Sequence, residues 1–99
     1  MDKIYIAKKE RFYKIMNNTI FEITETKSEL NPENPITYGI VAFTVKNDVK
    51  IKTDEVLDVS PNLNFVKQLV EKFNQFDLHI EHFRDVLYDC VYAEYSVNI

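Results

Sequence analysis

The chain has 99 residues, of which 45% are hydrophobic and 13% aromatic, and its formal net charge is −4. This composition excludes intrinsic disorder, and a chain of this length buries a core of its own, so we expect one domain over residues 1–99. No apolar run approaches the roughly 18 residues of a membrane helix, and no signal-peptide pattern opens the chain. We therefore expect a cytoplasmic protein with no membrane partner.

The charge is unevenly distributed along the chain. Residues 1–52 carry nine Lys or Arg against seven Asp or Glu, whereas residues 53–99 carry three against nine. Affinity for phosphate backbones comes largely from Lys and Arg, so the acidic second half disfavours direct binding to nucleic acid. The single cysteine, Cys90, excludes an internal disulfide and a cysteine-based zinc site.

A first β-hairpin is predicted over residues 11–25, which are rich in β-branched and aromatic side chains. Its turn is the Asn17-Asn18 pair, because asparagine tolerates the positive φ of a two-residue turn. This pairing puts Lys14 next to Phe21 across the ladder. The residues expected on its core face are Phe12, Met16, Phe21 and Ile23.

A second hairpin is predicted after the proline-containing loop at 28–35. Residues 36–46 are again rich in β-branched and aromatic side chains, and the Asn47-Asp48 pair provides the turn. The returning strand covers residues 49–53, with an extension through Val56 and Val59.

Gly39, the only glycine, lies inside the first strand of this second hairpin. Glycine weakens a strand interior, and its presence there usually marks a bulge or the close approach of another backbone or aromatic ring. We therefore predict a structural role for Gly39.

A first helix is predicted from the Ser60-Pro61 pair to Phe76, with the Ser60 hydroxyl as N-cap and proline at the first helical position. Spacing at 100° per residue separates an apolar arc from a polar one. The apolar arc, which we expect to be buried, comprises Leu63, Phe65, Val66, Leu69, Val70, Phe73 and Phe76.

A last helix is predicted from about His79 to about Ala93, with Glu81 in its first turn, where an acid complements the helix dipole. Its apolar arc is again expected to be buried. That arc comprises Ile80, Phe83, Val86, Leu87, Cys90, Val91 and Ala93.

These elements predict a two-layer α+β domain. Residues 1–59 form the β-rich half, an antiparallel meander of four to five strands. Residues 60–95 form two helices that follow the strands and pack on one face of the sheet.

Three segments resemble a family of roughly 100-residue bacterial proteins classed as a domain of unknown function. They are Tyr38-Gly39-Ile40, Leu57-Asp58-Val59-Ser60 and the run from His82 to Asp89. The chain departs from the family pattern at His79-Ile80, where Ser/Thr-Pro is usual, and in a longer tail beyond Cys90. The resemblance implies a similar fold and a bacterial cytoplasmic setting, but no activity.

Three tyrosines, Tyr88, Tyr92 and Tyr95, fall opposite the apolar arc of the last helix, beside Arg84 and Glu81. Tyrosine is enriched at protein interfaces because its ring buries much area while its hydroxyl stays hydrogen-bonded. These five residues are our predicted protein-binding surface, for a foreign partner or a second copy. The alternative is that residues 4–6 or 97–99 cover the rings.

His82, Asp85 and Asp89 follow one edge of the same helix at i, i+3 and i+7. A metal site is disfavoured, because His82 and Asp89 are about 10 Å apart by helix rise and no second helix supplies ligands. We predict structural charge pairing instead. The candidate basic partners are Lys8, Lys9, Arg11 and Lys14.

The sequence contains no phosphate-binding loop, nucleophile elbow or paired metal-binding histidines, so no catalytic residue, cofactor or small-molecule substrate is inferred. Cys90 is interpreted as a buried small hydrophobe. The leading hypothesis is a protein-binding or regulatory module that acts by surface occlusion. One alternative is an acidic, phage-type inhibitor that blocks the basic site of a nucleic-acid enzyme. A metal-dependent hydrolase centred on His82 and Asp89 is the weakest hypothesis.

Overall fold

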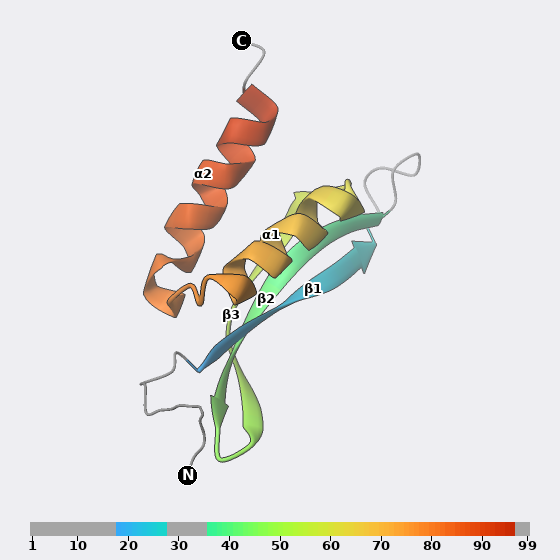
Figure 1. The fold of residues 1–99 in the computed structure, drawn as a ribbon. Coiled ribbons are helices and arrows are strands. Elements are labelled where there is room, and N and C mark those ends of the chain that lie inside the picture. The colour runs from blue at the N-terminus through green and yellow to red at the C-terminus, as the bar shows by residue number, and fades with distance from the viewer. Residues whose placement is uncertain (1–17, 28–35, 97–99) are drawn as a thin grey trace.

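The computed structural model describes residues 18–27 and 36–96. Three antiparallel strands form one sheet in the order β1-β2-β3, and both helices pack on the same face of it (Figure 1). The elements are β1 (Thr19–Lys27), β2 (Ile36–Lys46), β3 (Val49–Ser60), α1 (Leu63–Gln75), the 3₁₀ turn η1 (Ile80–His82) and α2 (Phe83–Ser96).

The predicted α+β class and the order of strands before helices are confirmed. The described residues contain three strands, so a sheet of four to five strands is not confirmed. The predicted strand at residues 11–16, with its Phe12 and Met16, lies outside the described residues.

The predicted second hairpin is confirmed, with Lys46 paired to Val49 across its turn. Asn47 and Asp48 have φ values of 52° and 65°, the left-handed conformation that a two-residue type I′ turn requires. The returning strand β3 continues from Val49 to Ser60, so the predicted extension of this strand through Val56 and Val59 is confirmed.

Gly39 lies where the backbone of the neighbouring strand β3 comes unusually close to β2. This confirms the close backbone approach that was predicted for this glycine. A Cβ atom at this position would lie 2.3 Å from the Val56 carbonyl oxygen and 2.9 Å from the Leu57 Cα. The β2–β3 register shifts between Tyr38 and Ile40, next to this contact. Glycine therefore makes room for the irregular β3 backbone.

Three phenylalanines join the sheet to both helices. The ring centroid of Phe21 lies 5.6 Å from that of Phe73 and 5.1 Å from that of Phe83. Phe21 comes from β1, Phe73 from α1 and Phe83 from α2, so one aromatic cluster links the sheet with each helix. The remaining buried hydrophobic residues around it are Ile40, Ala42, Val66, Leu69, Val70 and Leu87.

The Asn74 side chain closes part of the outer edge of β1. Its carbonyl oxygen accepts a hydrogen bond from the Phe21 N–H, and its amide donates one to the Phe21 carbonyl, each at 2.9 Å. Both main-chain groups of Phe21 on the edge away from β2 are thus satisfied by α1. The predicted Lys14–Phe21 pairing would have used these same groups.

Asn74→Ala should destabilise the fold by about 1–3 kcal/mol, because two partly buried hydrogen bonds are lost. Urea denaturation of the variant and the wild type measures the difference. Asn64→Ala, an exposed asparagine on the same helix, is the matched control and should change stability by less than about 0.5 kcal/mol. Equal effects from the two variants would contradict the edge-closing role of Asn74.

The start of α1 differs from the prediction. The N-cap is Asn62, whose side chain accepts a hydrogen bond from the Phe65 N–H at 3.2 Å, and the helix begins at Leu63. Ser60 is instead the buried last residue of β3, and its hydroxyl accepts a hydrogen bond from the Asn62 N–H at 3.0 Å. The Ser60-Pro61 pair is the connection between strand and helix rather than the cap.

Three residues predicted to be buried are exposed, because the ends of the helices extend past the elements that cover their middles. Phe76 follows the last turn of α1 as its C-cap and is 71% exposed. Leu63, the first residue of α1, is also exposed, as is Ala93 near the end of α2.

Candidate functional site

The side of α2 turned away from the core carries two tyrosines and three acids. Phe83 and Leu87 are fully buried and fix which side faces the sheet. Exposed residues follow η1 and α2 on the opposite side at helical spacing. We call this surface the α2 outer face, and it comprises Glu81, Asp85, Tyr88, Asp89 and Tyr92.

The three tyrosines of the predicted stripe have different environments. Tyr92 is 71% exposed, and Tyr88 is 51% exposed with its hydroxyl 3.3 Å from Nη1 of Arg84. Tyr95 is hydrogen-bonded through its hydroxyl to the Ser60 hydroxyl, and its ring packs edge-on against Phe65. Tyr95 therefore also fastens the end of α2 to the start of α1, whereas Tyr92 makes no such contact among the described residues.

Arg84 joins α2 to strand β3. Its Nε and Nη2 atoms donate to the two carboxylate oxygens of Asp54 at 2.9 and 2.7 Å, and Nη2 also donates to the Glu55 carbonyl at 3.2 Å. A two-point contact between guanidinium and carboxylate fixes orientation as well as distance. The predicted binding residue Arg84 thus holds α2 in place and supports the Tyr88 hydroxyl.

The Arg84–Asp54 pair also changes the acidity of its members. Hydrogen bonds from Arg84 lower the pKa of the Asp54 carboxyl below its usual 3.8, and the same contact raises the pKa of Arg84. Because the folded state lowers this carboxyl pKa, the pair contributes its full stability above the unfolded-state value. That contribution is lost as the pH falls through the lower folded-state value.

Asp54→Asn should therefore reduce the acid sensitivity of the fold. We expect the urea midpoint of the wild type to fall more steeply between about pH 5 and pH 2 than that of the variant. Asp85→Asn removes an exposed carboxylate of α2 and is the control. Its urea midpoint should fall with pH as steeply as that of the wild type. Equal slopes in Asp54→Asn and wild type would show that the pair does not link pH to stability.

The structure places His82, Asp85 and Asp89 in solvent along one edge of η1 and α2. None of them forms an ion pair with another residue of the described ranges. The basic residues predicted to pair with them, Lys8, Lys9, Arg11 and Lys14, lie outside those ranges. Within the part of the chain that the structure describes, no three His, Cys, Asp or Glu side chains are arranged to hold a metal ion.

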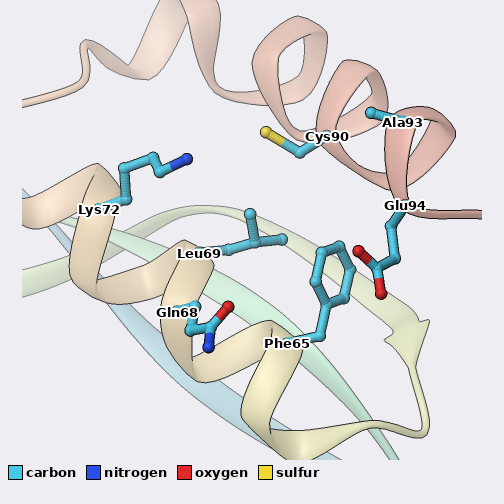
Figure 2. A pocket seen from close by; sticks show the side chains of 7 residues that line it. All are labelled: Phe65, Gln68, Leu69, Lys72, Cys90, Ala93 and Glu94. Atoms are coloured by element: carbon cyan, nitrogen blue, oxygen red, sulfur yellow. The ribbon is translucent and has the colours of Figure 1, made fainter.

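A second feature, the α1–α2 groove, lies between the two helices on another side of α2 (Figure 2). Its volume is about 320 Å³. Cys90 is half-buried there, rather than fully buried as predicted. The groove is lined by Phe65, Gln68, Leu69, Lys72, Cys90, Ala93 and Glu94.

The sequence did not identify Asp54 as a functional residue. The available signal was indirect: Arg84 is the only Lys or Arg of the last helix, so an acidic partner on another element was to be expected. No spacing rule connects residues thirty positions apart. Ser60 was noticed, but as a cap rather than as the contact of Tyr95.

The chain matches no protein-family model, no curated protein and no solved structure. The resemblance to a bacterial domain of unknown function therefore stays a prediction. Among the described helices, none is long and apolar enough to cross a membrane.

Proposed function

We propose that the protein is a binding module that docks another protein on the α2 outer face and acts by occluding the surface it covers. The observation that carries this proposal is Tyr92, a large aromatic side chain that is 71% exposed on a well-formed helix. Tyr88 lies one turn earlier on the same side. Paired exposed tyrosines supply contact area at a small entropic cost on binding.

Two contacts support this proposal by holding the helix that carries the surface. The Arg84–Asp54 pair fastens the first turn of α2 to β3, and the Tyr95–Ser60 hydrogen bond fastens its last turn. A helix fixed at both ends loses little further freedom when a partner binds, and such preorganisation favours affinity. In this proposal the module works in the bacterial cytoplasm, the setting that the sequence resemblance implies.

Tyr92→Ala should abolish specific binding in a pull-down from the native cell, because a central interface tyrosine contributes about 2 kcal/mol or more to binding. Lys67→Ala changes an exposed residue of α1 and should retain the same bound proteins as the wild type. A partner retained equally by Tyr92→Ala and the wild type would contradict the proposal. Light scattering after size exclusion tests the self-binding form, in which Tyr92→Ala turns a dimer into a monomer.

A second candidate function is an acidic inhibitor that covers a basic site on a nucleic-acid enzyme. It is favoured by Glu81, Asp85 and Asp89, three exposed carboxylates of the α2 outer face that form no ion pair within the described residues. Binding of this kind weakens steeply with salt, since exposed charges are screened beyond about 10 Å at 0.1 M. A tyrosine-centred interface is nearly indifferent to salt, so a salt series with the captured partner distinguishes the two.

A further inference from the structure

The α1–α2 groove has an apolar floor with opposite charges at its two ends. Leu69 is buried at the floor, and the half-buried Phe65 and Cys90 flank it. Figure 2 shows Lys72 reaching in from one end and the Glu94 carboxylate pointing toward Phe65 at the other. Phe65 and Lys72 are seven residues apart on α1, so their Cα atoms are separated by about 10 Å along the helix axis.

Neither charged residue of the groove is neutralised within the described part of the chain. Lys72 and Glu94 form no ion pair with each other or with another described residue. The groove therefore presents an ammonium, an apolar surface and a carboxylate in a row. Its volume of about 320 Å³ matches the lower end of small-ligand sites, which combine an apolar lining with a few polar groups.

We propose that the α1–α2 groove binds a small dipolar molecule with an apolar middle, a carboxylate at one end and an ammonium at the other. The ligand carboxylate pairs with Lys72, its apolar body covers Leu69 and Phe65, and its ammonium pairs with Glu94. Two sources share this chemistry: an ω-amino carboxylate and a short apolar peptide with free termini. The site is separate from the α2 outer face and does not depend on the proposed protein partner.

The test is a titration of the full-length ¹⁵N-labelled protein, followed by NMR, with 8-aminooctanoate as the probe. Octanoate lacks the ammonium and octylamine lacks the carboxylate, so each should bind about three- to tenfold more weakly. A leucine tripeptide with free termini is the second arm, and the source with the tighter binding is the better model of the ligand. Chemical-shift changes are expected for the backbone amides of residues that line the groove, Leu69 and Cys90 among them.

Two variants locate the two ends of the ligand. In Lys72→Met the probe should bind no better than octylamine, and in Glu94→Gln no better than octanoate. Lys67→Met, on the exposed side of α1, should behave as the wild type, and so should Tyr92→Ala on the α2 outer face. The absence of saturable shifts in the groove would overturn the proposal, as would equal losses in Lys67→Met and Lys72→Met.

Discussion

Gly39→Ala should destabilise the fold by about 3 kcal/mol, although alanine is the better residue in most secondary structure. The new methyl group would lie 2.3 Å from the Val56 carbonyl oxygen and 2.9 Å from the Leu57 Cα. Both obstacles are backbone atoms, so no side-chain rotation relieves the contact. Gly39 does not have a positive φ, and the expected loss is therefore steric rather than conformational.

Urea denaturation measures this loss, with Ile36→Ala as a control on the same strand. Ile36 is partly exposed at the start of β2, so its truncation should cost about 1 kcal/mol or less. Unchanged or increased stability in Gly39→Ala would mean that β3 moves away from β2 at little cost. That result would contradict a tight contact between the β3 backbone and Gly39.

Phe83→Ala should cost about 3–5 kcal/mol, a large share of the stability of a small domain. Its side chain is 0% exposed and contacts Phe21 of β1, and its ring centroid lies 6.3 Å from that of Phe73 of α1. Truncation leaves a cavity where the sheet and both helices meet. We expect α2 to lose its docking and the α2 outer face to lose its orientation, so that partner binding weakens as well.

Phe76→Ala is the matched control, because it removes the same side chain from a 71% exposed position. It should change stability by about 0.5 kcal/mol or less. Urea denaturation of both variants measures the difference. Equal urea midpoints for Phe83→Ala and Phe76→Ala would place Phe83 outside the core and contradict the packing of α2.

Local chemistry predicted the parts of the fold that depend on neighbouring residues. The Asn47-Asp48 turn was recognisable because two consecutive residues that tolerate positive φ separate two segments rich in strand-forming side chains. The buried middle of α1, at Val66, Leu69 and Phe73, was recognisable from helical periodicity.

Contacts between distant residues could not be predicted in this way. Asn74 binds the Phe21 main chain 53 positions away, and Arg84 reaches Asp54 across 30 positions. The tertiary packing of the helices on the sheet brings these groups together. Periodicity identifies the buried side of a helix, but not how far the neighbouring elements extend, which explains the exposure of Phe76.

The helix start was misplaced because two local signals competed. Ser60 followed by proline is a typical N-cap pattern, but Asn62 is an equally good cap two residues later. Tertiary structure decides between them: Ser60 is buried and its hydroxyl contacts Tyr95, which leaves Asn62 to cap α1. The same contact distinguishes Tyr95 from the exposed Tyr92. From the sequence alone, Tyr88, Tyr92 and Tyr95 had looked equivalent.

The most direct test of the α2 outer face is photocrosslinking in the native cell, with benzoylphenylalanine in place of Tyr92. Substitution at an exposed position on the outer side of α1, Lys67, provides the control. We predict a discrete crosslinked product from position 92 that is absent from position 67 and is lost when Tyr88→Ala is added. Products of equal yield from both positions, or none from position 92, would contradict a protein-binding role for this surface.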